Sequence, residues 1–214
     1  VLDEHNPEGD VGLYLDEWGT WYDPEPGREP GFLYQQNTLR DAVVAALNFH
    51  IFHQHTRRLH MANIAQTVNV LQAVILTEQE KMVLTPTYHA FEMYKLFQDS
   101  TFIPSAFDTM PEYKLGDLSV PRVSATTAKS ANGNLLVGLV NLDPAEPLQL
   151  SVSFEGFAAQ TASGRLLTAG AMDAHNTFDN PEAVKPVAID LTLEQGKLSL
   201  QLPAKSVAVI SVRP

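Results

Sequence analysis

The spacing of apolar residues changes along the chain, and this change limits the fold to one with two unlike parts. Residues 39–51 carry an apolar side chain at every fourth position, which is typical of a helix with one buried face. These positions are Leu39, Val43, Leu47 and Ile51. From Leu118 onward, apolar and polar residues alternate in short runs between turn residues, which indicates an antiparallel β-sandwich. The clearest runs are residues 148–154, 198–202 and 206–212.

A short strand with an acid near its end precedes the helix, within residues 12–22. On a pleated strand Glu17 shares one face with Leu13 and Leu15, whereas Asp16 takes the opposite face. A carboxylate on an apolar face loses its water, and groups that costly are often kept for chemistry. The structural alternative is that Glu17 pairs with an arginine at the end of the strand.

The next signals predict that a helix and a second strand follow. Asn37 or Thr38 can cap the helix, and Asp41 falls in its first turn, where a negative charge suits the helix dipole. Residues 59–65 are largely apolar and short enough for a buried parallel strand, with Gln66 at its end. Strand, helix and strand in this order make a right-handed crossover unit.

Proline and glycine mark the connections between these elements. Residues 3–10 are expected to form a loop that enters the first strand. Residues 23–31 contain three prolines and two glycines, so they form a loop that can overhang the end of the first strand. Thr85 and Pro86 begin a second helix, with threonine as the cap and proline in the first turn.

Composition excludes several classes of protein. The chain has 214 residues and a net charge of −11, with 25 acidic and 14 basic residues, which argues against a nucleic-acid surface. No apolar run approaches the roughly 18–20 residues of a membrane span, so no membrane partner is expected. Cysteine is absent, which rules out disulfides and thiolate metal sites and fits a reducing, cytoplasmic location.

Three blocks of sequence resemble one enzyme family. They are Leu15–Asp23 (LDEWGTWYD), Met61–Val70 (MANIAQTVNV) and Met172–Phe178 (MDAHNTF), joined by Asn37 and the stretch 41–46. In these blocks the chain resembles glycoside hydrolase family 51, the retaining α-L-arabinofuranosidases. The resemblance implies an α/β plus all-β fold, in which the last two β/α units of a (β/α)8 TIM barrel precede a jelly-roll-like antiparallel β-sandwich.

The resemblance also implies domain limits and a missing part. Residues 1–100 would carry strands 7 and 8 of the catalytic barrel with their helices, residues 101–117 a linker, and residues 118–214 the β-sandwich. Because such barrels need about 250 residues, we expect the chain to be the C-terminal portion of a longer enzyme. The N-terminal segment of that enzyme would be a separate chain, and the assembly a homo-oligomer such as a hexamer.

Site residues follow from the resemblance position by position. Glu17 matches the catalytic nucleophile at the end of the seventh strand, and Gln66 matches a glutamine that binds the arabinofuranosyl ring. The alternative for Gln66 is a side chain that bonds to loop backbone. Trp21 is a candidate sugar-facing wall, because an aromatic face suits the C–H surface of a sugar, and its alternative is core packing. The acid/base of the family stands in an Asn-Glu pair, which this chain lacks, so no acid/base is assigned.

Other conspicuous residues are expected to be structural. We expect Asp16 to be paired behind the barrel wall and Trp18 to have a structural role. The histidines at positions 50, 53, 55 and 60 are not expected to bind a metal, and the family needs no cofactor. His175 and Asn176 should form a hydrogen-bonding turn that contacts the barrel rather than substrate.

The expected function is hydrolysis of terminal non-reducing arabinofuranosyl groups in arabinoxylan or arabinan oligosaccharides. It would proceed through a covalent glycosyl-enzyme on Glu17. The alternative from another class is a non-catalytic carbohydrate-binding or structural β-sandwich, favoured by the absence of an acid/base. A second enzymatic alternative keeps the barrel but changes the sugar, as in an endoglucanase or a xylosidase of a related family.

Overall fold

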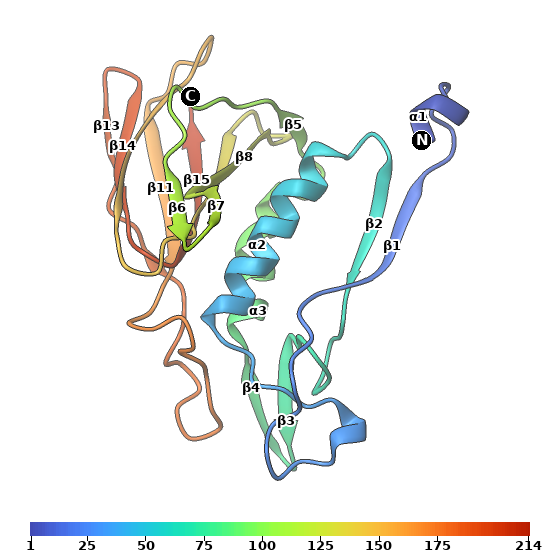
Figure 1. Ribbon diagram of the computed structural model, residues 1–214. Coiled ribbons are helices and arrows are strands. Elements are labelled where there is room, and N and C mark those ends of the chain that lie inside the picture. Colours follow the sequence, from blue (N-terminus) through green and yellow to red (C-terminus); the bar gives the residue numbers. More distant parts are fainter.

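The first two strands lie side by side and parallel, joined by the longest helix of the chain. In the computed structural model, which describes residues 1–214, β1 (Leu13–Trp18) pairs with β2 (Leu59–Ile64). Helix α2 (Leu39–Gln54) connects them. Figure 1 shows α2 between this strand pair and the β-rich half of the molecule. The predicted order of strand, helix and strand is confirmed.

Helix α2 begins where its sequence predicts. Thr38 is the N-cap residue, and its backbone N–H donates to Asp41 Oδ2 at 2.7 Å. The four-residue stripe is wrong at its last position, because Ile51 is 52% exposed. At 3.6 residues per turn, each step of four residues drifts around the helix, so the fourth member leaves the buried face. The buried positions are Leu39, Asp41, Ala42, Val43, Ala45, Ala46 and His50.

A hairpin and a second helix follow β2. The hairpin consists of β3 (Ile75–Glu78) and β4 (Lys81–Leu84), which the sequence patterns did not predict. Helix α3 (Pro86–Tyr94) begins as predicted, with the Tyr88 N–H donating to Thr85 Oγ1 at 3.3 Å. It continues into the 3-10 turn η2 (Lys95–Phe97). No helix combines the length and the apolar character that crossing a bilayer would require.

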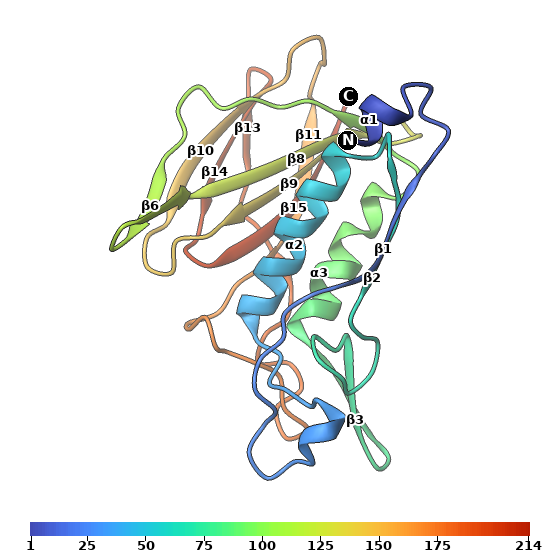
Figure 2. The same cartoon turned by 45° about the vertical axis from the view of Figure 1, so that its right-hand side comes forward.

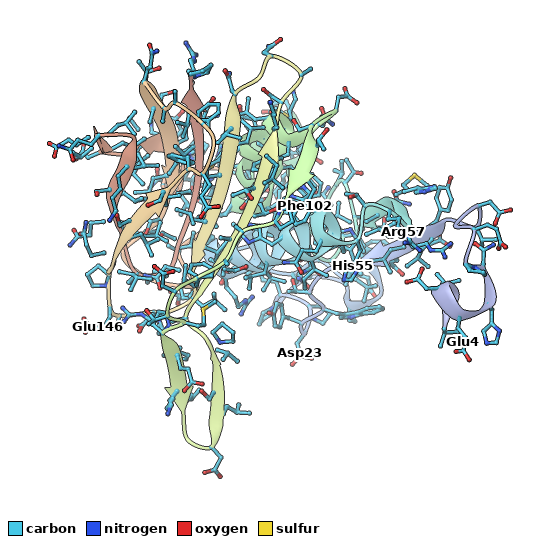
Figure 3. All side chains as sticks on the ribbon, turned by 90° about the horizontal axis from the view of Figure 1, so that it is seen from above. Glu4, Asp23, His55, Arg57, Phe102 and Glu146 are labelled. Atoms are coloured by element: carbon cyan, nitrogen blue, oxygen red, sulfur yellow. The ribbon has the colours of Figure 1, made fainter.

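Two segments that were predicted as loops each contain one short helical turn. Residues expected only as an entry loop contain the one-turn helix α1 (Leu2–His5), and the loop after β1 contains the 3-10 turn η1 (Pro30–Phe32). Arg57 and Arg58 each form an ion pair with Asp3, which holds α1 against the turn between α2 and β2. Figure 3 shows Glu4 of α1 at the edge of the molecule opposite the β-rich half.

The β-rich half is a two-layer antiparallel sandwich. The larger sheet has the order β12 (Val187–Ala188), β11 (Thr161–Leu167), β15 (Ser206–Arg213), β9 (Leu135–Asn141), β8 (Val123–Lys129) and β5 (Thr101–Ile103). The smaller sheet has the order β10 (Leu148–Ser153), β14 (Lys197–Leu202) and β13 (Thr192–Glu194). One apolar cluster takes side chains from both sheets, so they pack face to face. The three alternating runs predicted as strands are confirmed as β10, β14 and β15.

The stretch expected as a linker carries structure of its own. Residues 101–103 form β5, which pairs with β8 at the edge of the larger sheet. Residues 112–121 form a hairpin of β6 (Glu112–Leu115) and β7 (Leu118–Pro121), which projects from the body of the molecule in Figure 3. The sandwich therefore begins before residue 118.

The larger sheet is covered on both faces, which joins the two halves of the chain. Leu136 and Val140 of β9 belong to an apolar cluster with α2 and α3, whereas Val137 and Leu139 belong to the interior of the sandwich. This alternation is the period of two that a strand imposes. Figure 2 shows α2 and α3 lying between the larger sheet and the β1–β2 pair. A continuous core thus fixes the strand pair relative to the sandwich.

Candidate active site

A pocket opens where β1 and β2 end. Because the two strands are parallel, their C-terminal ends meet at the same edge of the sheet. The residues that line the pocket are Asp16, Glu17, Ile64, Ala65, Gln66, Thr67 and Val68. Glu17 and Gln66, which are 49 positions apart in the sequence, therefore share one cavity.

Glu17 offers an unpaired carboxylate to this pocket. Its side chain is exposed in this chain, and it forms neither an ion pair nor a side-chain hydrogen bond. No arginine among residues 1–214 neutralises it. A carboxylate without a protein partner is free to meet a ligand, which is what either nucleophilic or electrostatic work requires.

Asp16 lies in the same pocket, contrary to the expectation that it is paired behind the sheet. It is exposed and has no ion-pair partner. The cause is local, because the register between β1 and β2 shifts between Leu15 and Trp18. Strict alternation fails at such an irregularity, so neighbouring side chains can reach the same side. The pocket thus carries two adjacent carboxylates, which gives it a negative charge.

Gln66 also has a free side chain. Its backbone N–H donates to the Val70 carbonyl at 3.2 Å, and its carbonyl accepts from the Val74 N–H at 3.3 Å. Neither bond uses the side-chain amide, which forms no hydrogen bond within the chain. Within residues 1–214 this amide therefore does not bond to loop backbone. An amide with two donors and an acceptor at the pocket wall can bind hydroxyl groups.

The two tryptophans after Glu17 have opposite environments. Trp18 is 8% exposed and its ring packs against Phe49, Phe52 and Phe91, which agrees with the structural role expected for it. Trp21 is 66% exposed, so it does not pack in the core that residues 1–214 form, and it is not among the residues that line the pocket. Its ring is available to a ligand, and its role as a sugar-facing wall remains a prediction.

The clustered histidines do not converge on a common point. His50 Nε2 lies 2.6 Å from the Tyr94 hydroxyl and its Nδ1 lies 2.7 Å from Ser124 Oγ. His53 Nδ1 lies 3.1 Å from Thr126 Oγ1. Burial lowers the pKa of His50 to about 3, helped by the neighbouring His53. These two side chains join α2 to the sandwich, and no group of three or more potential ligands is arranged to hold a metal.

His175 and Asn176 contact the first half of the chain, as predicted. His175 forms an isolated β-bridge with Thr38, the cap of α2. Asn176 Nδ2 donates to the carbonyls of Leu84 at 2.8 Å and Val184 at 2.9 Å. The segment thus fastens a loop of the sandwich to the start of α2 and the end of β4.

The proline-rich loop after β1 lies to one side of the pocket. Arg28 forms an ion pair with Glu78 of β3 at 3.2 Å, and its guanidinium lies 4.5 Å from the centre of the Tyr34 ring. None of residues 23–31 lines the pocket in this chain. The structure therefore attaches the loop to the β3–β4 hairpin rather than over Glu17.

Two buried glutamines at the site had no sequence signal. Gln35 and Gln72 are 1% and 0% exposed, and both bond to the backbone around Thr20. They stand in irregular segments without apolar periodicity, so no pattern marks them as buried. Only the spatial approach of the loops after β1 and β2 reveals them.

Comparison with known proteins places the chain in a family. Residues 16–206 match the sequence model described as the α-L-arabinofuranosidase C-terminal domain. The chain belongs to this family. The matched region includes both Glu17 and Gln66, and it extends through most of the sandwich.

Individual relatives agree with this assignment. An intracellular exo-α-L-arabinofuranosidase of Bacteroides ovatus is 42% identical over the whole chain. The crystal structure of the GH51 arabinofuranosidase from Xanthomonas axonopodis pv. citri has 47% sequence identity and a TM-score of 0.96 over 99% of the chain. A family 51 α-L-arabinofuranosidase from Bifidobacterium longum has 27% identity and a TM-score of 0.84 over 95% of the chain. The resemblance to glycoside hydrolase family 51 is thereby confirmed.

The chain corresponds to less than half of these proteins. It spans 42% of the Bacteroides ovatus relative and 43% of the Xanthomonas structure. It therefore has the fold of an arabinofuranosidase C-terminal portion, mostly β with few helices and several antiparallel sheets.

Proposed function

We propose that this chain is the C-terminal part of a retaining α-L-arabinofuranosidase. The enzyme would release terminal non-reducing arabinofuranosyl groups from arabinoxylan or arabinan oligosaccharides. Glu17 would act as the nucleophile and form a covalent glycosyl-enzyme, and Gln66 would bind the furanose ring. The observation that carries the proposal is that Glu17 and Gln66 line one pocket with free side chains, within a chain that belongs to the α-L-arabinofuranosidase C-terminal family.

The chemistry assigns a limited role to each residue. In a retaining glycosidase one carboxylate attacks the anomeric carbon while a carboxylic acid about 5–5.5 Å away protonates the leaving oxygen. The free Glu17 carboxylate suits the first task. Asp16 is too short to duplicate it from the same position, and we assign it no chemical step. The acid/base would come from the segment that precedes this chain in its relatives.

The exposed faces of β1 and β2 support the presence of such a segment. Leu13, Tyr14 and Met61 are 47%, 56% and 46% exposed. Apolar side chains and unpaired edges of this kind need a covering layer. In the proposal β1 and β2 are strands 7 and 8 of a (β/α)8 barrel, and the segment with the first six strands covers them. The sandwich would then be the jelly-roll-like C-terminal domain.

Covalent trapping tests the nucleophile. The assembled enzyme, with its N-terminal segment, is treated with a mechanism-based inhibitor that forms a stable arabinofuranosyl-enzyme, and the labelled peptide is sequenced by fragmentation. We expect the label on Glu17, and fragment ions resolve it from the adjacent Asp16. A label on any other carboxylate contradicts the assignment.

Kinetics on an aryl α-L-arabinofuranoside test the activity. We expect Glu17→Gln to lower kcat by several orders of magnitude, because the glutamine amide cannot attack the anomeric carbon to form the covalent intermediate. Added azide should restore turnover of Glu17→Ala and give a glycosyl azide of inverted configuration. If the wild-type assembly does not cleave the substrate, the non-catalytic alternative stands. If it prefers an aryl pyranoside, the proposed specificity for arabinofuranosyl groups is wrong.

The partner and the location are tested separately. A denaturing gel and mass spectrometry of protein purified under native conditions should show the N-terminal segment together with residues 1–214. A 23.5 kDa species that stays monomeric and soluble alone would contradict this association. Light scattering of the assembly distinguishes a hexamer from smaller oligomers. We also propose a cytoplasmic location, which cell fractionation can check.

A further inference from the structure

The backbone on both sides of Trp21 is bound by one buried side chain. The Tyr22 N–H donates to Gln35 Oε1 at 2.9 Å, and Gln35 Nε2 donates to the Thr20 carbonyl at 3.2 Å. Both bonds of this side-chain amide to backbone groups therefore end on residues that flank Trp21. The Trp21 ring itself is 66% exposed.

A second buried glutamine connects this loop, which does not itself line the pocket, to the end of β2. Gln72 Oε1 accepts from the Thr20 N–H at 2.9 Å, and Gln72 Nε2 donates to the Asp41 carbonyl at 2.8 Å. The backbone N–H of Gln72 donates to the Ala65 carbonyl at 2.8 Å. Ala65 lines the pocket and directly precedes Gln66. Gln72 thus ties the loop after β1 to the end of β2 and to the first turn of α2.

Burying two side-chain amides beneath a loop requires that their polar atoms be paired by hydrogen bonds. A buried amide must have its donors and acceptor paired, or its desolvation destabilises the fold. Here two such amides stabilise irregular backbone that carries an exposed aromatic ring. Exposed loops are ordinarily the mobile parts of a fold. A ring held in place before a ligand arrives loses less entropy on binding, and supporting hydrogen bonds set its position.

We infer that Gln35 and Gln72 are positioning residues that hold the Trp21 ring in a fixed place relative to Glu17 and Gln66. This inference rests on the proposed function, in which Trp21 forms a wall of the sugar site. Neither glutamine lines the pocket, so both act through the backbone. The Gln35 side chain bonds only to the loop that carries Trp21, whereas Gln72 bonds to this loop and to the end of β2 and so holds the two together.

A double-mutant cycle distinguishes positioning from general stabilisation. Gln35→Met keeps the length of the side chain but removes its hydrogen bonds, and it is combined with Trp21→Ala in the assembled enzyme. We expect Gln35→Met to lower kcat/KM on an aryl α-L-arabinofuranoside about tenfold when Trp21 is present, since small displacements in a site cost this much or more. In the Trp21→Ala background the same substitution should cost less than twofold. Equal losses in the two backgrounds overturn the inference.

A neighbouring residue supplies the matched control. Gln36 is exposed, and the one hydrogen bond of its side chain is to the His175 ring, at 3.1 Å. Gln36→Met should leave kcat/KM within twofold of the wild type. A tenfold loss in this variant would mean that any glutamine replaced in this loop has the same effect, and the role given to Gln35 would be lost.

Amide hydrogen exchange tests the hydrogen bonds without substrate. Gln35→Met should speed exchange at the Tyr22 amide, and Gln72→Met should speed it at the Thr20 amide, each by at least tenfold. Gln36→Met should change neither. Unchanged exchange at both amides overturns the inference. This readout is independent of catalysis. If Glu17→Gln retains activity and the proposed function fails, exchange still tests whether the two glutamines hold the backbone around Trp21.

Discussion

His50 Nε2 lies 2.6 Å from the phenolic oxygen of Tyr94, and this contact joins the two helices that carry the strand pair on the sandwich. The other ring nitrogen of His50 lies 2.7 Å from Ser124 Oγ of β8. His50 is 1% exposed, so its ring serves as a buried neutral linker among α2, α3 and the larger sheet. A neutral imidazole can donate through one nitrogen and accept through the other, which fits two hydroxyl partners.

Stability should fall as the pH drops below about 6.5, because His50 stays neutral only in the folded state. Burial and the neighbouring His53 lower its pKa from 6.5 to about 3. Between these values the unfolded chain binds a proton that the folded chain does not, so acid favours unfolding. One such group contributes up to about 2 kcal/mol of lost stability between pH 6.5 and pH 5. Urea melts at both pH values measure this loss.

The control for this prediction separates His50 from other acid effects. His50→Gln keeps polar atoms at the site but cannot titrate. The number of protons taken up on unfolding, given by the slope of the free energy of unfolding against pH, should therefore be smaller by about one in this variant. Burial also lowers the pKa of His53, which acts in the same direction and remains in the variant. His55→Gln, at an exposed position, should retain the wild-type pH dependence. An identical slope in His50→Gln and wild type would contradict the assignment.

Substitution of Trp18 should affect mainly stability, whereas substitution of Trp21 should affect mainly activity. Trp18→Ala empties part of an aromatic cluster and should lower the free energy of unfolding by about 3–5 kcal/mol. Trp21→Ala removes an exposed ring and should change it by less than about 0.5 kcal/mol. The effects on KM for an arabinofuranoside should be the opposite: Trp21→Ala should raise KM more than Trp18→Ala does. Denaturant melts and initial rates of the same two proteins check both statements.

Local sequence signals were enough to place several elements. The start of α2 depends on Thr38 and Asp41, three residues apart, and the structure has that cap. Three strands of the sandwich, β10, β14 and β15, follow from alternation within seven residues. The four-residue repeat ending at Ile51 failed because a helix turns every 3.6 residues, so a strict repeat of four overstates the buried face.

Properties that depend on distant contacts could not be predicted. Asp16 shares the pocket of Glu17 because the pairing of β1 with β2 is irregular, and that irregularity has no local sequence mark. The burial of Gln72 depends on loops that begin at Thr20 and Ala65, far apart in the sequence. The site could be proposed only because the residues around Glu17 resemble a known family.

Gly138 should not tolerate a side chain. A Cβ at this position of β9 would lie 2.9 Å from Thr126 Cγ2 and 2.9 Å from the Tyr94 hydroxyl. Gly138→Ala therefore forces Tyr94 away from His50 and should lower the free energy of unfolding by about 1–3 kcal/mol. Gly170→Ala is the matched control, because a Cβ there would meet no atom within 4 Å. If thermal melts of the two variants coincide, the packing described for Tyr94 is wrong.

Asp41 should be needed as a carboxylate rather than as an amide. It is 0% exposed, its Oδ2 accepts from the Thr38 N–H at 2.7 Å, and its Oδ1 accepts from Thr20 Oγ1 at 2.7 Å. An asparagine has a single carbonyl oxygen, so Asp41→Asn would set an N–H group against one of these donors. We expect a loss of about 1–3 kcal/mol in the free energy of unfolding.

Substitution of a second aspartate controls for the change in charge. Asp108 is exposed and forms no ion pair, so Asp108→Asn should leave the unfolding midpoint unchanged. Because Thr20 directly precedes Trp21, Asp41→Asn should also speed amide exchange in residues 20–22, even where the helix remains folded by circular dichroism. An Asp41→Asn protein as stable as the wild type, with unchanged exchange in that loop, would show that the buried carboxylate holds neither the cap nor the loop.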